Sequence, residues 1–417
     1  MSTVHIVGAG IAGLAAATWL LAAGRRVAIH ESAGHAGGRC RSFFDETLDR
    51  TIDNGNHLLL SGNVAMMDYL RRIGAEDQLT GPSRAAFPFV DLSDGSRWTV
   101  EPNAGPIPWW ILLSGRRIPG TSVFDHFSAL NLATANADAT VVEAVGGEGP
   151  LFRRFWEPLA VAVLNTPAET GAATLLWRVV RETFGRGATA CLPLIAREGL
   201  SQTFIEPALT YLEANGAKIA FNRRLRAIER EGDAVTALDF GDVDVSLDST
   251  DSIILAVPPA AATSLLPGIE APLESHAIVN AHFRLEGAPA AVIGGMPFLG
   301  LVGGVAQWLF VRGDIVSITV SAADALAEES TERIAELTWA DVAVALDLPA
   351  SPIPPCRVVK ERRATFAQTP AAEMRRPGPR SPLGNLFLAG DWTNTGLPAT
   401  IEGAIRSGEA AACAVAT

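Results

Sequence analysis

The sequence is poor in lysine and cysteine. Only two of its 33 basic residues are lysines, Lys218 and Lys360, and only four of its 417 residues are cysteines. The cysteines lie far apart and form no CxxC pair: they are Cys40, Cys191, Cys356 and Cys413. This spacing excludes a zinc ribbon and a disulfide framework and fits a reducing compartment. We therefore predict a cytoplasmic protein. Because the histidines also lack the spacing of metal ligands, we predict no bound metal.

Concentrated positive charge is missing as well. The 45 acidic residues outnumber the basic ones, which gives a net charge of −12 at pH 7, and the arginines are dispersed along the chain. A nucleic-acid backbone requires a dense basic face, so the sequence excludes nucleic-acid binding. The first residues lead directly into an apolar strand without the basic segment and cleavage site of a signal peptide, so we expect none.

Long uninterrupted apolar helices are also missing. The one uncharged stretch that suggests a membrane span, Gly287 to Val311, contains six glycines and two prolines that would interrupt a helix. We expect two buried strands there, Ala290–Ile293 and Leu299–Val302, joined by a Gly-Gly-Met-Pro turn. Hydrophobic residues make up 48% of the chain and charged residues 19%, which predicts a large folded core and excludes disorder.

The first thirty residues contain a dinucleotide-binding pattern. The apolar strand Val4–Val7 leads into a Gly-Ala-Gly-Ile-Ala-Gly turn, a helix over 14–23 and a second strand, Arg26–His30, that ends at an acid. In such a βαβ unit the glycines permit a tight turn, close approach of backbone N–H groups to a pyrophosphate, and packing of the helix on the strand. The helix N-terminus favours the anion, and the acid accepts hydrogen bonds from a ribose. The predicted cofactor contacts here are Gly8, Gly10, Ile11, Ala12, Gly13, Glu31 and Ser32.

A second glycine turn follows six residues after Glu31, in Gly37-Gly38-Arg39-Cys-Arg-Ser42. With this turn the sequence resembles the superfamily of flavin-dependent amine oxidases and phytoene desaturases, whose members continue the βαβ unit in the same way. The resemblance implies that the cofactor is FAD and not NAD. It also implies that Gly38 and Arg39 lie at the pyrophosphate, where the guanidinium group counters the negative charge with paired hydrogen bonds.

The C-terminal part of the chain resembles the other half of this flavin site. The segment Asn385–Asp391 predicts a strand that delivers an acid at its end, and an alanine-rich helix follows. In the superfamily this strand lies beside the first one. The resemblance implies that Gly390 and Asp391 contact the ribitol and phosphate of FAD, and that Thr400 and Ile401 face the pyrimidine edge of the flavin. Glu402 either joins them or only supports the turn.

The same resemblance implies an α/β fold in which a Rossmann-like FAD-binding domain is built from discontinuous segments. A substrate domain with a mixed sheet and helices is inserted between them. We predict the FAD-binding domain at residues 1–80, 196–267 and 376–417, and the substrate domain at 81–195 and 268–375. Leu225 is a candidate for contact with the adenine, and an ordinary core leucine is an equal alternative.

Four further blocks narrow the resemblance. They are Asp53–Leu60, Trp156–Pro167, Lys360–Phe366 and Ala389–Thr400. Together they resemble the squalene-associated FAD-dependent desaturases, now understood as the hydroxysqualene dehydroxylases of bacterial hopanoid biosynthesis. Residues 54–57 read Asn-Gly-Asn-His where that family usually has Asn-Gly-Gln-His, which shortens one amide side chain. Gly55, Asn56 and His57 are accordingly expected close to the flavin.

This resemblance implies the reduction of a long apolar isoprenoid alcohol, hydroxysqualene. An acid assists the loss of water, an allylic cation forms, and reduced FAD delivers hydride from N5 to give squalene, after which an unidentified electron donor must reduce the FAD again. The candidates for the acid are His57, Glu361 and Asp53, although a lone histidine is more often structural. Because water would quench the cation, we expect an apolar tunnel. Pro106–Leu113 and Ala290–Phe310 could line it or form a mouth that rests on a membrane.

Three other functions remain open. A carotenoid or phytoene desaturase would share the fold and transfer hydride in the opposite direction, but those enzymes are generally longer. A flavin amine oxidase would need an aromatic cage and a lysine near N5, whereas this chain has two tyrosines and no lysine between residues 219 and 359. A non-catalytic isoprenoid-binding protein could retain FAD, but both flavin elements are intact here.

Overall fold

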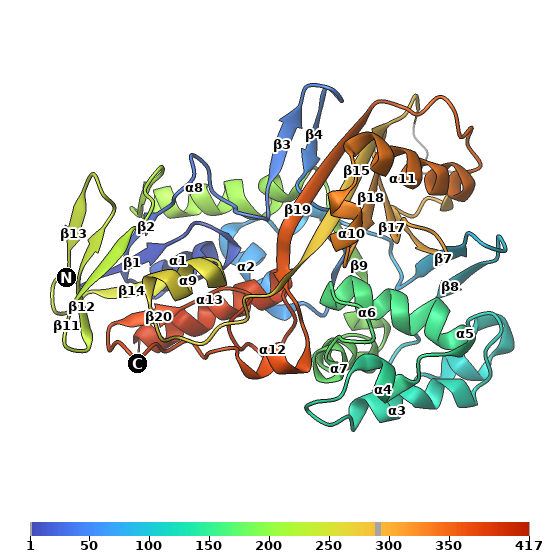
Figure 1. Ribbon diagram of the computed structural model, residues 1–417, viewed down its shortest axis with the longest axis horizontal. Coiled ribbons are helices and arrows are strands. Elements are labelled where there is room, and N and C mark those ends of the chain that lie inside the picture. Colours follow the sequence, from blue (N-terminus) through green and yellow to red (C-terminus); the bar gives the residue numbers. More distant parts are fainter. Residues whose placement is uncertain (1, 288–292, 417) are drawn as a thin grey trace.

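One end of the elongated molecule is built around a five-stranded sheet (Figure 1). The structure, a computed structural model, describes residues 2–287 and 293–416. Every neighbouring pair of strands in this sheet is parallel. In spatial order the strands are β10 (Lys218–Ala220), β2 (Arg26–His30), β1 (Thr3–Val7), β14 (Ser252–Leu255) and β20 (Leu386–Leu388). Three segments that are far apart in the sequence therefore form one sheet.

Helices with small side chains pack closely beside this sheet. Helix α1 (Ile11–Ala22) is almost entirely apolar and buried, as expected for a helix enclosed on most sides. Helix α13 (Ile401–Ala416) packs on it so closely that a Cβ atom on Gly408 would lie 2.1 Å from the carbonyl oxygen of Ala12. Two more helices, α2 (Val64–Ile73) and α8 (Glu206–Ala214), complete the same hydrophobic core.

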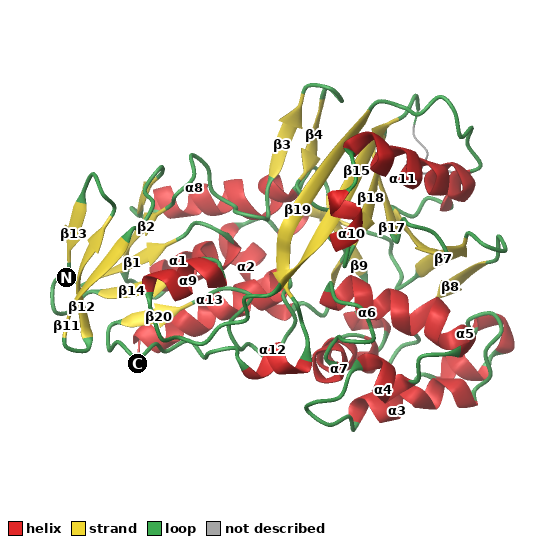
Figure 2. Cartoon of the chain, viewed as in Figure 1, coloured by secondary structure: helices red, strands yellow, loops and turns green. Residues whose placement is uncertain are grey.

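A seven-stranded mixed sheet occupies the other half of the molecule (Figure 2). All its neighbours are antiparallel except β16 and β7, which pair in parallel. Apolar side chains on one face pack against helix α11 (Thr331–Leu346), with α10 (Asp324–Glu328) beside it. In spatial order the strands are β19 (Cys356–Phe366), β15 (Ser275–Arg284), β18 (Ile315–Val320), β17 (Trp308–Arg312), β16 (Phe298–Val302), β7 (Phe87–Asp91) and β8 (Arg97–Val100).

A lobe of short helices lies at the end of the molecule opposite both chain termini (Figure 1). Its core is rich in aromatic side chains and continues into the seven-stranded sheet, because Phe298 and Phe310 of that sheet belong to the same hydrophobic cluster. The helices are α3 (Ser128–Ala133), α4 (Val141–Val145), α5 (Gly149–Leu151), α6 (Glu157–Leu164) and α7 (Ala173–Glu182). We refer to residues 104–186 as the helical lobe.

Smaller elements connect these parts. An antiparallel sheet of β11 (Ala227–Glu231), β12 (Ala234–Asp239) and β13 (Asp244–Ser246) flanks the five-stranded sheet, and helix α9 (Pro259–Leu265) follows β14. Strands β3 (Ser42–Asp45) and β4 (Arg50–Asp53) form a hairpin. The remaining elements are β5 (Leu59–Leu60), β6 (Leu79–Thr80), β9 (Pro193–Ala196) and α12 (Pro370–Met374).

The structure confirms the predicted fold class and the N-terminal βαβ unit. In the uncharged stretch from Gly287 to Val311, the predicted strand Leu299–Val302 is confirmed as β16, whereas Ala290–Ile293 lies mostly outside the described residues. Over residues 2–287 and 293–416, no helix combines the length and apolar character needed to cross a bilayer. The residue boundaries of the two domains stay a prediction.

Candidate active site

The glycine turn after β1 has the geometry of an anion-binding loop. Gly8 has a φ of +107°, and a Cβ atom there would lie 2.3 Å from the carbonyl oxygen of Ala256. A Cβ atom on Gly13 would lie 2.0 Å from the carbonyl oxygen of Gly8. A Cβ atom on Gly10, by contrast, would meet no atom within 4 Å. Two glycines are therefore required by packing, and the third leaves space beside the backbone.

The N-terminus of helix α1 faces this space without a polar cap. Gly10 is its extended N-cap residue, no side chain of the described residues caps the helix, and its first turn contains no acidic residue. The first N–H groups of a helix have no partner within the helix and, together with the helix dipole, attract an anion. Ile11, Ala12 and Gly13 form this first turn, so their place fits the predicted pyrophosphate contact.

Glu31 is anchored beside the same turn. Its buried carboxylate accepts hydrogen bonds from the backbone N–H groups of Ala9 (2.7 Å) and Ala33 (2.8 Å) and from the hydroxyl of Ser32 (3.0 Å). Its backbone carbonyl accepts from the N–H group of Arg223, which brings the segment before β11 to this point. Leu225, two residues further, is buried against the core of the five-stranded sheet. Both alternatives for Leu225 therefore remain.

The Gly-Gly-Arg turn contacts both halves of the predicted cofactor site. The N–H group of Gly37 donates to the carbonyl oxygen of Ala9 (2.8 Å), and a Cβ atom on Gly38 would lie 3.5 Å from the Cα atom of Gly10. The guanidinium group of Arg39 donates to both carboxylate oxygens of Asp391, each at 2.8 Å, and to the carbonyl oxygen of Ala364. This ion pair joins residues that are 352 positions apart in the sequence.

Arg39 and Asp391 differ in their access to solvent. The Asp391 side chain is 9% exposed and the Arg39 side chain 44% exposed. The neighbouring Asp391 charge raises the pKa of Arg39, although desolvation by the surrounding protein opposes it. Gly390, with a φ of +138°, donates its N–H group to Ser407 of α13 (2.8 Å). A positively charged, accessible guanidinium group thus lies between the two predicted FAD-binding segments.

The start of α13 is a capped helix N-terminus. The Thr400 hydroxyl accepts from the N–H group of Gly403 (3.0 Å), and Ile401 is the first residue of the helix. Glu402 is 4% exposed, and its carboxylate accepts from the N–H groups of Ala65 and Met66 at the start of α2. Glu402 therefore caps a neighbouring helix, and this contact favours a supporting role.

Residues 54–57 attach the FAD-binding half to the seven-stranded sheet. The Asn56 amide donates to the Thr319 hydroxyl (3.0 Å) on β18 and to the Asn280 side-chain oxygen (3.4 Å) on β15. The Asn280 amide in turn donates to the backbone carbonyl of Asn54 (3.3 Å), and a Cβ atom on Gly55 would lie 3.4 Å from that amide nitrogen. These bonds fix the turn that carries His57.

Glu361 and His57 lie around this turn, and both are accessible. Glu361, on β19, is half-buried and accepts a hydrogen bond of 3.4 Å from the Asn54 amide. The His57 side chain is exposed, yet protein on several sides desolvates it. This desolvation lowers the pKa of His57, the Asp53 charge opposes the effect and the Arg39 charge adds to it. An accessible but desolvated ring is expected at the wall of an internal space.

Asp53 is fully engaged in structural contacts. One carboxylate oxygen accepts from the Ser42 hydroxyl (2.6 Å) and the Leu200 N–H group (2.9 Å), and the other accepts from the Arg312 guanidinium group (2.6 Å). Asp53 is 4% exposed. Three donors already occupy this buried carboxylate, so little of it is free to contact a substrate, and the geometry disfavours Asp53 as the catalytic acid.

Arg376 is a structurally important residue that no sequence pattern indicates. Its side chain is fully buried and donates to the backbone carbonyls of Asp391 (3.2 Å), Thr393 (2.5 Å) and Leu397 (2.8 Å), and it also pairs with Glu373 (2.6 Å). It thereby fixes the loop from Asp391 to α13. Because all three carbonyls belong to an irregular loop, no sequence periodicity indicates that Arg376 donates to them.

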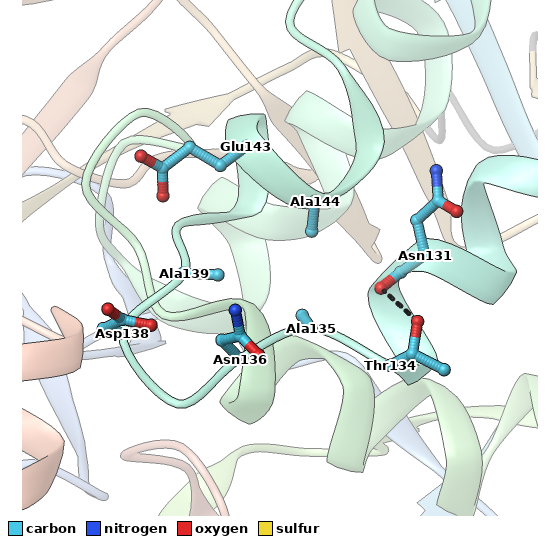
Figure 3. Close-up of a pocket in the computed structure, with 8 residues that line it drawn as sticks. All are labelled: Asn131, Thr134, Ala135, Asn136, Asp138, Ala139, Glu143 and Ala144. Carbon is cyan, nitrogen blue, oxygen red and sulfur yellow. Dashed lines mark hydrogen bonds between the residues drawn. The ribbon is translucent and has the colours of Figure 1, made fainter.

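A cavity of about 560 Å³ lies in the helical lobe, and none of the residues predicted at the flavin lines it (Figure 3). It is lined by Asn131, Thr134, Ala135, Asn136, Asp138, Ala139, Glu143 and Ala144. The two carboxylates make it unsuitable for an anion, and Glu143 already caps helix α4. Across residues 2–287 and 293–416, no three His, Cys, Asp or Glu side chains gather in a way that could hold a metal ion.

Comparisons with known proteins identify relatives over the whole chain. The family model for flavin containing amine oxidoreductases matches residues 11–416. The hydroxysqualene dehydroxylase of Rhodopseudomonas palustris is 47% identical, with 98% of this chain and 97% of that protein covered, and that of Sinorhizobium fredii is 46% identical over the same shares. A probable zeta-carotene desaturase of Synechococcus elongatus is 25% identical, with 99% of this chain and 98% of that protein covered. Among solved structures, putrescine oxidase bound to putrescine has a TM-score of 0.72 at 19% identity, covering 99% of this chain and 98% of the other.

Proposed function

The chain belongs to the flavin containing amine oxidoreductases and, within them, to the hydroxysqualene dehydroxylases, and we propose that it reductively removes the hydroxyl group of hydroxysqualene. In the balanced reaction, hydroxysqualene and FADH2 give squalene, water and FAD. The observation that carries this proposal is the identity of 45–47% with three hydroxysqualene dehydroxylases over nearly the full length. The desaturase alternative rests on weaker likeness, at 25% identity or less.

FAD is the cofactor of this family and, when reduced, supplies the hydride. The uncapped start of α1, the open space at Gly10 and the accessible cation of Arg39 support a dinucleotide at this place. We propose that the glycine turn and helix N-terminus hold the pyrophosphate and that Glu31 holds a ribose. The other proposed contacts are Ser32, Gly38, Gly55, Asn56, His57, Leu225, Gly390, Asp391, Thr400 and Ile401.

Replacement of the anchored acid tests the ribose contact. We expect Glu31→Ala to weaken FAD binding by about 1–3 kcal/mol, because both the ribose and the backbone of the turn lose an acceptor. Fluorescence of released flavin, titrated against protein, gives the dissociation constant. Glu46→Ala, at an exposed position in the β3–β4 hairpin, is the control and should bind FAD normally. Full affinity in Glu31→Ala would remove the ribose contact.

We propose His57 as the acid that assists the departure of water, with Glu361 as the alternative. Both are accessible beside residues 54–56, whereas the Asp53 carboxylate is buried and already accepts from three donors. Desolvation by the surrounding protein lowers the pKa of His57, so its ring is mostly uncharged at neutral pH and gains its proton only in more acidic solution.

The rate of a single turnover should therefore rise as the pH falls from 7.5 to below 6.5. In His57→Gln the rate should drop, as expected for loss of a general acid, roughly 100-fold or more, and the rise toward acidic pH should vanish while FAD stays bound. Stopped-flow absorbance of the flavin between pH 5 and 8 measures both. If His57→Gln keeps the wild-type profile and Glu361→Gln loses it, the assignment passes to Glu361.

Apolar side chains next to the turn could receive the isoprenoid chain. Leu58 and Leu60, which follow His57, pack into the aromatic cluster that contains Phe298, Trp308 and Phe310 of the seven-stranded sheet. We propose that the substrate chain lies along this cluster, which would keep water from the carbocation. The aromatic rings would also stabilise the positive charge through their π-faces.

An anaerobic single turnover tests the proposed reaction. The bound FAD is reduced, hydroxysqualene is added, and flavin reoxidation is followed by absorbance while the product is identified by mass spectrometry. One squalene per flavin oxidised is the expected result. Absence of reaction, together with reduction of the oxidised enzyme by squalene or phytoene, would make the protein a desaturase. Repeated turnover needs an electron donor, which we propose to be a separate cytoplasmic reductant.

A further inference from the structure

Large apolar side chains are exposed together on the helical lobe. Fourteen large hydrophobic residues of the described chain are exposed, and seven of them lie between residues 107 and 130. These seven, which we call the lobe patch, are Ile107, Trp109, Leu112, Leu113, Phe124, Phe127 and Leu130. Phe124 is 80% exposed and Leu112 65% exposed. Monomeric proteins seldom expose so many neighbouring apolar side chains without an interaction partner.

The two halves of the lobe patch lie side by side. The ring of Trp110 contacts the ring of His126 edge to face, with centroids 5.6 Å apart, so the segments 107–113 and 124–130 share one surface. Each segment contains a single 3₁₀ turn, Trp109–Leu112 and Phe124–Phe127. Such short turns can bury few side chains. In the first of them Trp110 enters the core and Ile111 is half-buried, whereas Trp109 and Leu112 remain exposed.

The charge around the lobe patch differs from that of the whole protein. Between residues 104 and 135 the only charged side chains are Arg116, Arg117 and Asp125, a net charge of +1 in a chain of net charge −12, and Arg116 also pairs with Glu101 at 3.6 Å. The guanidinium group of Arg116 lies over the ring of Trp109, 5.5 Å from its centroid. Tryptophan and arginine beside apolar side chains suit the interface of a bilayer, where rings lie at the headgroups and cations meet anionic lipids.

The apolar interior is continuous from the lobe patch to the candidate active site. Trp110 and Ile111, adjacent to the patch, belong to the same hydrophobic cluster as Leu58 and Leu60, which follow His57. This cluster therefore links the exposed lobe patch, by direct packing of apolar side chains, to the residues that follow His57.

We propose that the lobe patch inserts into the headgroup region of a bilayer that contains anionic lipid, and that the isoprenoid alcohol reaches the active site from the bilayer at this surface. The second half of this proposal rests on the proposed function, because it requires an apolar substrate. A second copy of the chain fits the patch less well. A two-fold contact would place the positively charged edge of the patch, with Arg116 and Arg117, against the same edge of the second copy.

Flotation with vesicles tests the surface. FAD-loaded protein is mixed with vesicles of 70% phosphatidylcholine and 30% phosphatidylglycerol, and the fraction that rises with lipid in a sucrose gradient is measured by flavin absorbance. The double variant Leu112→Glu/Phe124→Glu should bind these vesicles about tenfold less than the wild type, because two inserted apolar side chains become charged. Both side chains are exposed, so the variant should fold and retain FAD.

A matched control places the same charges elsewhere. Val243, between β12 and β13, and Val344, on α11, are 43% and 62% exposed and lie outside the lobe patch. Val243→Glu/Val344→Glu should float as the wild type does. Equal flotation of the wild type and the patch variant would overturn the proposal. Failure of the wild type to bind vesicles would also overturn it. So would a dimer that forms in the wild type and in the control variant but not in the patch variant.

Turnover from two substrate preparations separates this proposal from the proposed function. With hydroxysqualene in detergent micelles, the patch variant should react as fast as the wild type, and with hydroxysqualene in vesicles about tenfold more slowly. Equal rates from vesicles would contradict delivery through the patch. If the wild type converts no substrate in either preparation but still floats with vesicles, the proposed function fails and the membrane surface stands.

Discussion

Gly10→Val should yield a folded protein without FAD. A Cβ atom on Gly10 meets no protein atom within 4 Å, and the residue is in an extended conformation that valine adopts readily. The added side chain would instead fill the space in front of the uncapped start of α1, where the pyrophosphate is proposed to bind. The purified variant should lack the flavin absorbance band, and its far-ultraviolet circular dichroism should match that of the apoprotein.

Two other glycine variants are the controls for this experiment. Gly378→Val adds the same side chain at another position where a Cβ atom meets nothing within 4 Å, and it should retain FAD. Gly13→Val should fail to fold, because its Cβ atom would overlap the carbonyl oxygen of Gly8. If Gly10→Val bound one FAD per chain, the pyrophosphate would have to lie elsewhere.

Arg376→Met should destabilise the protein far more than replacement of an exposed arginine. The side chain is fully buried, and its removal leaves Glu373 and the carbonyls of Asp391, Thr393 and Leu397 without their donor. Breaking a buried ion pair from one side typically costs about 3–5 kcal/mol. The free energy of unfolding, measured by urea denaturation, should fall by that amount. FAD should be lost at lower urea concentration, since Asp391 lies in the released loop.

The neighbouring arginine is a stringent control. Arg375 is exposed, and it donates to the carbonyl of Ala371 one turn earlier on the surface. Arg375→Met also removes one positive charge at the C-terminal end of α12, and it should alter the free energy of unfolding by less than about 0.5 kcal/mol. Similar losses in both variants would show that net charge, and not the buried contacts of Arg376, stabilises the loop.

The parts of the fold that depend on local pattern could be predicted from the sequence. The strand, glycine turn, helix and strand of residues 3–30 are contiguous, and each glycine has a local steric reason. The resemblance extended this prediction to the distant strand β20 but placed it beside the first strand, which is wrong: β14 lies between β1 and β20, and no local periodicity indicates this order. The seven-stranded sheet was foreseen only as a mixed sheet. Its order depends on pairings such as β7 with β16, across more than 200 residues.

The candidate site was harder to predict, because its chemistry depends on partners far along the chain. Arg39 was expected at the FAD pyrophosphate, which stays a prediction, and the sequence did not indicate the ion pair that it forms with Asp391. His57 and Asp53 looked alike as acid candidates, but burial and hydrogen bonds, which a sequence does not display, separate them. The segment 124–130 was overlooked as a surface, since a single 3₁₀ turn has too little length for apolar periodicity to appear.

The discontinuous five-stranded sheet has a consequence for how the chain is made. Strands β1 and β2 leave the ribosome long before β20 and α13, and at translation rates of 5–20 residues per second the delay is roughly 20–70 s. During this time the apolar surface of α1 that later packs on α13 has no cover. This surface of α1 is therefore a site where the nascent chain is prone to aggregate until its last helix emerges.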